Sequence, residues 1–398
     1  MTRIRLRRAF VAPMTACLLL AACGGETGHD HAEDHAASGH ADSGRADGAA
    51  AADGAGEADQ VEDGVPVAVA ATGGRTVLPK PDDPGIASVY GPLCKASDYN
   101  GGVPKIDFKK DKIGFVQSEP DTSAYRAAST KSMKDEAKKR GWNLLYANAG
   151  NDAATQNRQM KQMVDQGAKA VIISPVSSQG LTEALDYAKQ RKVPIIAVDR
   201  SLTGVTACSD VMAQLGSNFI EQGRRAADAL IKATGGHATV AILLGMAGVN
   251  VTDDRTRGFV ERIREQAPDI EIVDQRTAGF NRDLGEQVFA DVIKAHPEID
   301  ALYAENDEMG LGALRHLKKI ARNGRDKIKI VSIDGTKDAV NAIIDGDFDA
   351  VIECNPRFGP SSFDALEDFF GEGTPAVTFT TDGDYDVSTA KARQADAF

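Results

Sequence analysis

The chain has 398 residues, 42% of them hydrophobic and 26% charged, an ordinary composition for a folded protein of two or three domains. Its formal net charge is −12. Nucleic acids and anionic membrane surfaces both attract clustered lysine and arginine, so this acidic balance argues against either as a partner of the folded part.

The first 22 residues have the pattern of an export signal, in which arginines precede an apolar stretch at residues 9–20. The Leu-Ala-Ala-Cys sequence that follows ends at Cys23 and resembles the bacterial lipobox, whose cysteine is acylated and becomes the mature N-terminus. We therefore expect a lipoprotein signal peptide over residues 1–22 and lipidation at Cys23. This lipid would hold the protein on the extracytoplasmic face of a bacterial membrane, at the cell surface or in the periplasm. An ordinary secretory signal with an incidental cysteine is the alternative.

Residues 23–102 are predicted to form a disordered tether after the signal. Acidic residues, alanine and glycine fill most of the stretch up to residue 64, so it cannot bury enough apolar surface to offset the entropy lost on ordering. Four of the seven histidines lie here, and without fixed geometry we expect a solvated spacer rather than a metal site. Weak metal scavenging is the alternative. Residues 65–102 are richer in proline and aromatics and are expected to lie against the folded body.

From residue 105 onward, apolar strands alternate with amphipathic helices. The expected strands cover residues 113–116, 143–147, 170–174, 193–198, 239–244, 270–274, 301–304, 329–333 and 350–352. The expected helices cover residues 124–140, 154–166, 181–190, 213–233, 253–266, 282–295 and 309–321. This alternation predicts parallel sheets that are covered by helices on both faces. Because about 290 residues are too many for one core, we predict an α/β protein with two Rossmann-like lobes.

Five of these strands lead to side chains that can hold a polar ligand. These residues are Tyr125, Arg126, Asp199, Arg200, Asn306, Asp334 and Glu353. In an open α/β sheet, ligands bind outside the carboxyl ends of the strands. Carboxylates, an amide and guanidinium groups at that edge can grip the hydroxyls of a small sugar, so the pattern favours a binding protein over an enzyme. Asp199 and Asp334 also fit the alternative of helix N-caps, which are common after strands.

Short blocks in the last three quarters of the chain resemble the periplasmic sugar-binding proteins of ABC importers. They lie at residues 112–116, 125–126, 198–201, 254–259, 279–282, 305–313, 332–335, 351–353 and 359–367, in the order of that family. The resemblance is to the type I fold of ribose- and galactofuranose-binding proteins, covers nearly all of residues 105–398, and is strongest for the galactofuranose branch. Two departures are Tyr125, where that branch has tryptophan, and Glu353, where the ribose type has glutamine.

The resemblance implies two lobes joined by three hinge crossovers that close over one sugar. It places the first lobe at residues 103–210 plus 355–382 and the second at residues 211–354 plus 383–398. It also implies that the ligand-binding residues are Tyr125, Arg126, Asp199, Arg200, Arg255, Phe280, Asn306, Asp334 and Glu353, with the tyrosine and phenylalanine stacking on the ring. The loop before Tyr125 is one residue longer than in the galactofuranose type, so neither Gln117 nor Glu119 is assigned.

The function implied is capture of a monosaccharide, a galactofuranose-like hexose or related sugar, for delivery by a monomeric, lipid-anchored protein to an ABC permease and its ATPase. No cofactor, metal or nucleic acid is expected. A sensor component that presents ligand to a chemoreceptor or sensor kinase is one alternative, and another polyol such as a pentose or inositol is a second. Enzyme chemistry lacks support because the chain has neither a Gly-x-Ser-x-Gly elbow nor a phosphate-binding Gly-x4-Gly-Lys loop.

Three cysteines remain once the signal is removed and Cys23 is lipidated: Cys94, Cys208 and Cys354. Disulfides persist outside the cytosol, so one pair and one free thiol are expected. We favour Cys94 with Cys208, because Cys354 falls beside the proposed ligand site. Three buried free thiols are the alternative.

Overall fold

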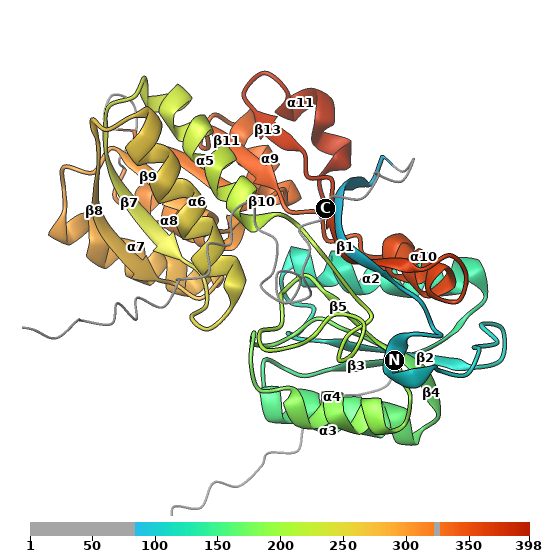
Figure 1. Ribbon diagram of the computed structural model, residues 1–398. Helices are drawn as coiled ribbons and strands as arrows, with labels where there is room; N and C mark the ends of the chain where they lie inside the picture. The colour runs from blue at the N-terminus through green and yellow to red at the C-terminus, as the bar shows by residue number, and fades with distance from the viewer. Residues whose placement is uncertain (1–83, 322–326) are drawn as a thin grey trace, which may run out of the picture. The chain divides into compact units, whose positions relative to one another are not determined.

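A computed structural model describes residues 84–321 and 327–398 of the chain. The signal peptide, Cys23 and residues 23–83 of the expected tether lie outside these described residues. Within the described ranges, no helix is both long and apolar enough to cross a membrane. The described residues form two lobes, each built around one sheet (Figure 1).

The sheet of the first lobe has seven strands in the order β1-β12-β6-β5-β4-β2-β3. The strands are β1 (Ile86–Cys94), β2 (Lys112–Gln117), β3 (Asn143–Asn148), β4 (Ala168–Ile173), β5 (Ile195–Val198), β6 (Ala213–Gly216) and β12 (Thr374–Thr380). All neighbours pair in parallel except β1, which runs antiparallel to β12. The buried strands β4 and β5 are almost wholly aliphatic, as expected for a parallel sheet that is covered on both faces.

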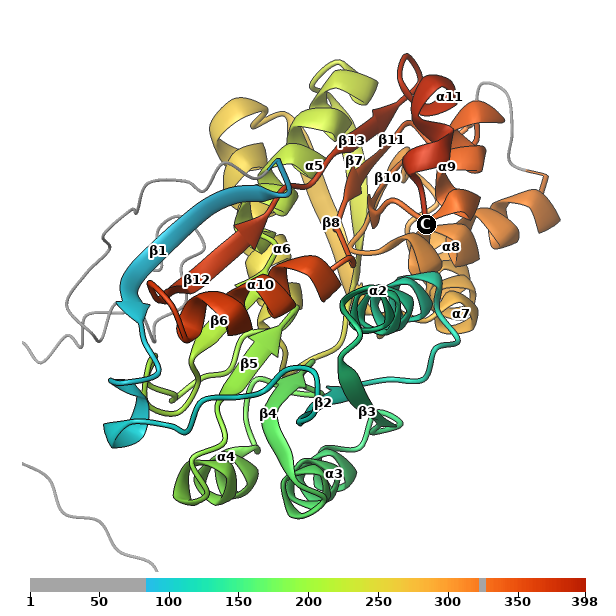
Figure 2. The ribbon, with the colours of Figure 1, turned by 90° about the vertical axis from the view of Figure 1, so that its right-hand side faces the viewer.

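Helices pack on both faces of this first sheet. They are α2 (Ala124–Arg140), α3 (Ala153–Asp165), α4 (Thr182–Gln190) and α10 (Gly359–Phe369). Figure 2 shows α2 and α10 side by side on one face, with α3 and α4 on the other. A short 3-10 turn, η2 (Tyr99–Gly101), follows β1.

The sheet of the second lobe has six strands in the order β13-β11-β10-β9-β7-β8. They are β7 (Ala238–Leu244), β8 (Ile270–Thr277), β9 (Ala301–Ala304), β10 (Lys329–Asp334), β11 (Ala350–Glu353) and β13 (Asp384–Asp386), of which only β13 is antiparallel to its neighbour. Its helices are α5 (Phe219–Thr234), α6 (Asn250–Gln266), α7 (Arg282–Ala295), α8 (Asp307–Lys319), α9 (Lys337–Ile344) and α11 (Ala390–Arg393), followed by the turn η4 (Gln394–Asp396). This arrangement confirms the predicted α/β fold of two lobes.

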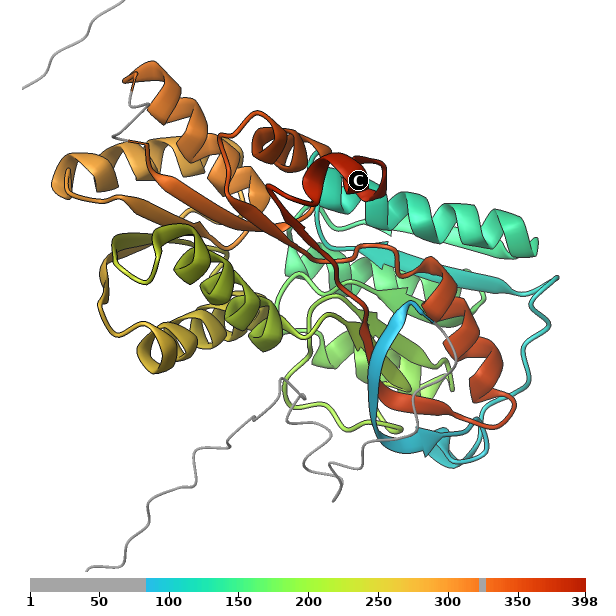
Figure 3. The same cartoon turned by 90° about the horizontal axis from the view of Figure 1, so that it is seen from above.

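In the described part, the chain passes three times between the lobes: from β6 to α5, from β11 to α10 and from β12 to β13 (Figure 3). One carboxylate joins all three passages. Asp382 accepts hydrogen bonds through Oδ1 from Ser217 Oγ at 2.9 Å and from Asn355 N at 2.9 Å. Through Oδ2 it accepts from Gln222 Nε2 on α5 at 2.8 Å. The three hinge segments are therefore tied together at one half-buried carboxylate.

The boundary expected at residues 210 and 211 is wrong, and so is the first part of the helix predicted over residues 213–233. Residues Ala213–Gly216 form strand β6, which pairs with β5 and β12 and so belongs to the first lobe. Helix α5 begins only at Phe219, after Asn218 caps it by accepting a hydrogen bond from Glu221 N at 3.0 Å. A strand of four residues is too short for its period to be separated from the helix that follows.

The expectation of a disordered tether over residues 23–102 is wrong for its last part. Ile86–Cys94 is a strand in the first sheet, with Val89 and Cys94 buried. Its partner β12 lies almost three hundred residues further along the chain, so local composition could not reveal the pairing. The described part of residues 65–102 does lie against the folded body, as expected.

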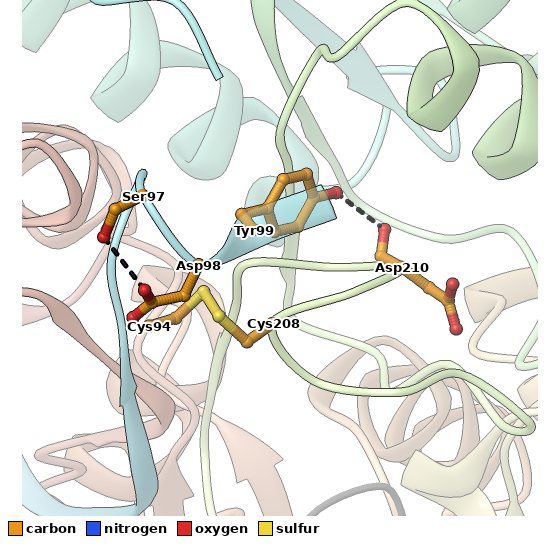
Figure 4. The surroundings of a disulfide bond; sticks show 6 residues. All are labelled: Cys94, Ser97, Asp98, Tyr99, Cys208 and Asp210. Carbon is orange, nitrogen blue, oxygen red and sulfur yellow. Dashed lines mark hydrogen bonds between the residues drawn. A yellow bond between two sulfur atoms is a disulfide. The ribbon is translucent and has the colours of Figure 1, made fainter. Parts of the chain in front are cut away.

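A disulfide joins Cys94 to Cys208, as predicted, and Cys354 is a buried free thiol. The bond connects the end of β1 to the loop before β6 (Figure 4). Beside it, the buried Tyr99 donates from its hydroxyl to the backbone carbonyl of Asp210 at 3.1 Å. The two links attach β1 and η2 to a segment more than a hundred residues further along the chain.

Candidate ligand-binding site

A cavity of about 370 Å³ lies between the two lobes, at the carboxyl ends of β2, β5, β9 and β10. Eight of the nine predicted ligand-binding residues line it: Tyr125, Arg126, Asp199, Arg200, Arg255, Phe280, Asn306 and Asp334. Glu353 does not line it. The structure thus brings together residues that are spread over more than two hundred positions of the sequence.

The first lobe contributes one connected polar wall, which we call the first-lobe wall: Glu119, Tyr125, Arg126, Asp199 and Arg200. Asp199 accepts a hydrogen bond from Tyr125 Oη at 3.0 Å and another from Arg126 Nη1 at 2.6 Å. Arg126 Nε also donates to Glu119 at 2.9 Å, and Arg200 Nη2 donates to the other oxygen of the same carboxylate. Two carboxylates and two guanidinium groups therefore neutralise each other within one lobe.

Local backbone geometry aims these side chains. Ser123 caps α2 by accepting from Arg126 N at 3.2 Å, so Tyr125 and Arg126 stand in the first turn of the helix and face the cavity. Asp199 follows β5 with a positive φ of 67°. A left-handed residue that is not glycine is uncommon and often marks a functional position.

The ion pairs shift the protonation of the first-lobe wall. Burial alone would raise the pKa of the Glu119 carboxyl, but Arg126 and Arg200 outweigh it and lower that pKa to about 2. Burial raises the pKa of the Tyr125 phenol, so it remains a neutral donor. Among the described residues, none accepts a hydrogen bond from the buried Arg200 Nε, which leaves a donor at the cavity wall.

The second lobe contributes fewer internal bonds to its wall, which we call the second-lobe wall: Arg255, Asn306 and Asp334. Arg255 Nε donates to Gln222 at 3.0 Å, and Nη1 donates to the backbone carbonyl of Glu305. Its remaining nitrogen Nη2 lies 3.7 Å from Asp334 Oδ1, which is too long for a hydrogen bond. The pair is oriented but leaves room for ligand oxygens.

Helix α6 carries Arg255 close to α5 because of glycine at the crossing. A Cβ on Gly258 would overlap the backbone carbonyl of Ile220, and one on Gly223 would overlap that of Arg255. The two helices can therefore approach closely, and Arg255 on α6 lines the cavity.

Asp334 ends β10, is 5% exposed and has a positive φ of 145°. Burial raises the pKa of its carboxyl well above the ordinary value, despite the nearby Arg255. The N-cap alternative is wrong for this residue, since Thr336 caps α9 by accepting from Ala339 N at 3.3 Å. It is wrong for Asp199 as well, because the next element of the chain is strand β6 rather than a helix.

Asn306, unlike Asp199 and Asp334, does cap a helix. Its Oδ1 accepts from Met309 N at 3.0 Å at the start of α8, so the amide Nδ2 is the group that can donate into the cavity. Asn306 is 6% exposed and lines the cavity. A capping role and a ligand-facing role are therefore compatible in one side chain.

Apolar groups cover other parts of the cavity. Phe280 lies on its wall with a positive φ of 59°, and its ring covers the backbone at Gly245, where any Cβ would overlap it. Met246 and Val251 extend this surface. Such a surface suits the C–H faces of a sugar ring, which are apolar.

Glu353 instead belongs to the hinge. One of its carboxylate oxygens accepts from Arg357 Nη1 at 3.2 Å and the other from Gly383 N at 2.8 Å. These partners draw the side chain away from the cavity, and the next residue, Cys354, lines it instead. Burial raises the pKa of the Cys354 thiol to about 12, so it is a neutral, inert group.

Sequence reasoning left Glu119 unassigned, although this carboxylate connects both arginines of the first-lobe wall. It also missed the outer residues Asn151, Asn281, Arg282, Asp283 and Glu308, which line the cavity mouth. The available signal for Glu119 was its place in the loop that follows β2, at the same sheet edge as Asp199.

Buried acids also stand behind the second-lobe wall. Glu305 accepts from Gly245 N at 2.7 Å and from Thr256 Oγ1, and burial raises its pKa to about 7. Asp307 accepts from Thr336 N at 2.8 Å, and burial raises its pKa as well. Within residues 84–321 and 327–398, no cluster of histidine, cysteine or acidic residues has an arrangement that could hold a metal ion.

A family model and a relative of known function both match this chain. The family described as "Periplasmic binding protein domain" matches residues 113–358. The galactofuranose-binding protein YtfQ of Escherichia coli (strain K12) is 34% identical over 285 residues, which cover 70% of this chain and 89% of that protein.

Solved structures agree in fold. The crystal structure of a galactofuranose binding protein is 34% identical with a TM-score of 0.67, over 72% of this chain and 97% of that one. The arabinose-transporter binding protein of Shewanella sp. ANA-3, bound to α- and β-L-arabinofuranose, is 32% identical with a TM-score of 0.68, over 72% of this chain and 95% of that one.

Proposed function

The chain belongs to the periplasmic binding protein family, a family of solute-binding proteins rather than enzymes, and we propose that it captures a neutral monosaccharide between its lobes. The named relatives above bind galactofuranose or arabinofuranose. A sugar in the five-membered ring form, such as a galactofuranose-like hexose, is therefore our first candidate ligand.

The observation that carries this proposal is the balance of charge within the two walls, apart from the outer lining residues Arg282, Asp283 and Glu308. Glu119, Asp199 and Asp334 face Arg126, Arg200 and Arg255, so three potential anions oppose three cations among the wall residues. A charged ligand would leave one of these groups without compensation, whereas a neutral polyol does not. Hydroxyls both donate and accept, so they suit carboxylates and guanidinium groups equally.

Each residue has a role in this proposal. Asp199 and Arg200 hold neighbouring hydroxyls from the first lobe, and Arg126 is a further donor. Arg255, Asn306 and Asp334 hold hydroxyls from the second lobe. Tyr125 and Phe280 pack against the ring. Glu353 has no direct contact in this assignment and serves the hinge.

Binding energy of a useful size follows from a few such contacts. A hydrogen bond to a charged group contributes roughly 1.5–3 kcal/mol, and a handful of them exceeds the cost of association and closure. Micromolar affinity corresponds to about −8 kcal/mol. A ligand that contacts both walls favours the closed arrangement through its higher affinity for that state.

Membership of this family supports delivery to an ABC permease with its ATPase as the first candidate role, and the closed, liganded monomer is the form that would dock. Lipidation at Cys23 would keep the protein next to the membrane outside the cytoplasm. Presentation of the ligand to a chemoreceptor or sensor kinase is the second candidate function, since it would use the same closed surface. A pentose or inositol is the second candidate ligand.

The test is a thermal-shift screen of the purified mature protein against pentoses, hexoses and inositols, followed by calorimetry on the ligands that raise the melting temperature. We expect one or a few furanose-forming sugars to bind, and Asp334→Ala to weaken them at least tenfold. Preference for an anionic or cationic solute, or unchanged affinity in the variant, would contradict the proposal.

A further inference from the structure

The two lobes also touch at a second place, outside the hinge. The loop before α6 and the first turn of α6 in the second lobe meet the first-lobe loops that follow β4 and β5. Ser178 N donates to the carbonyl of Gly248 at 3.2 Å, and Asn250 N donates back to Ser178 Oγ at 3.1 Å. These hydrogen bonds join residues of one lobe directly to residues of the other.

Asn250 is the centre of this contact. Its Oδ1 accepts a hydrogen bond from Ser201 N at 2.9 Å, and its Nδ2 donates to Ser201 Oγ at 3.2 Å. Nδ2 is held in place by Asp254 Oδ2, also at 3.2 Å, one turn further along α6. One side chain therefore makes two bonds across the lobes, and its backbone makes a third.

The same loops carry the cavity walls. Arg200, next to Ser201, donates to the carbonyls of Pro175 and Val176 at 3.2 and 3.0 Å, which braces the two first-lobe loops against each other. On the other side, Val251 follows Asn250 and lines the cavity. The contact therefore joins the two lobes directly beside the cavity.

We propose that Asn250 is an affinity-determining residue that does not bind the ligand: it clasps the closed lobes together and sets how much of the unliganded protein is closed. Apparent affinity scales with the fraction of protein already in the binding-competent state. Weakening the clasp therefore lowers affinity for every ligand by the same factor, whereas loss of a ligand contact changes the preference between ligands.

The first measurement needs no ligand. Spin labels at Arg158→Cys on α3 and Glu261→Cys on α6, both exposed, report the distance between the lobes in the full mature chain. We expect a closed population in the unliganded protein that falls about tenfold in Asn250→Ala, as loss of two hydrogen bonds predicts. Ser178→Ala, which removes the acceptor from the opposite lobe, should act in the same direction with a smaller effect.

The second measurement rests on the proposed function. Calorimetry with two sugars of different affinity should show both weakened about tenfold in Asn250→Ala, with their ratio unchanged. Asn157→Ala is the matched control, since Asn157 makes three side-chain hydrogen bonds within the first lobe alone and should lower stability without changing lobe distance or affinity.

Identical distance distributions in Asn250→Ala and the parent, or no closed population in the unliganded parent, would overturn the clasp. A loss of affinity for one sugar alone would overturn it too, because it would make Asn250 a ligand contact. If no sugar binds the parent protein, the proposed function fails, while the label distances still decide the clasp.

Discussion

The two walls of the cavity differ in how completely their charges are paired. In the first-lobe wall, Arg126 and Arg200 share the carboxylate of Glu119, and the pKa of that acid falls to about 2. Behind the second-lobe wall, Glu305 accepts hydrogen bonds from an amide and a hydroxyl, and its pKa rises to about 7. A partly buried glutamate that is paired with arginines and a fully buried one that is not thus shift in opposite directions.

This difference shows how burial and pairing compete. A guanidinium in direct contact outweighs the cost of removing a carboxylate from water, whereas neutral donors do not. The first lobe therefore presents a preformed, ion-paired surface, and the second lobe presents acids that are short of partners. We infer that a ligand is positioned by the first wall and supplies missing hydrogen bonds to the second.

The largest expected effect comes from breaking the first-lobe wall with Asp199→Ala. The change leaves Arg126 without one of its two carboxylates in a buried site, and breaking a buried ion pair typically costs about 3–5 kcal/mol. We expect a fall of this size in the free energy of unfolding by urea, and binding at least a hundredfold weaker by calorimetry. Asp364→Ala, which removes a half-exposed partner of Arg140, should cost less than about 1 kcal/mol.

The second prediction separates the walls by pH. The unfolded Glu305 ionises near its ordinary value of 4.5 and the folded one near 7, so in that window the folded state binds more protons. Unfolding stability must therefore fall as pH rises through the window, by about 3 kcal/mol for this group. Glu305→Gln should remove that slope in urea titrations at several pH values. Curves that stay parallel to the parent would contradict the assignment.

Glu119 predicts the opposite dependence in the same titrations. Its folded pKa of about 2 lies below its ordinary value of 4.5, so its contribution is present above pH 4.5 and is lost on acidification towards pH 2. The contribution of the first-lobe wall to the free energy of unfolding should therefore fall in acid. In that range Glu305 is protonated and does not lower this free energy.

The third prediction concerns Asp334, the acid of the second-lobe wall. Because burial raises its pKa, the neutral isostere in Asp334→Asn should raise the free energy of unfolding at pH 7 by about 1–2 kcal/mol. Ligand affinity should nevertheless fall about tenfold, since the amide replaces one carboxyl oxygen by a nitrogen that cannot accept a hydrogen bond. A variant that loses stability as Asp199→Ala does would show that the two walls are alike.

The smallest expected effect is that of Tyr125→Phe, which removes the hydroxyl that orients Asp199 and keeps the ring. One hydrogen bond is worth about 1 kcal/mol, so affinity should fall about fivefold in calorimetry. Tyr187→Phe is the control, because it removes a similar bond to Asp165 on the surface, away from the cavity. Equal affinities for both variants and the parent would remove the positioning role of the hydroxyl.

Much of the architecture was predictable because the apolar periods are strong. The helix predicted over residues 282–295 and the strand over residues 301–304 match α7 and β9 at both ends. Strand β6 was absorbed into the following helix, since four residues carry too little periodicity, and β1 was missed because its pairing partner lies near the other end of the chain.

The composition of the site was equally visible in the sequence. Parallel strands end at one edge of a sheet, so polar residues that follow several strands must meet there, and Asp199, Asn306 and Asp334 do. The order of the elements along the chain and the residue type at the end of each strand can both be read from the sequence.

Only the tertiary structure decided which acid faces the cavity and which serves the hinge. Glu119 turns inward because Arg126 and Arg200 converge on it, whereas Glu353 turns away to Arg357 and Gly383. The direction of a side chain at the end of a strand depends on partners from distant segments. Those partners exist only once the lobes have folded and come together.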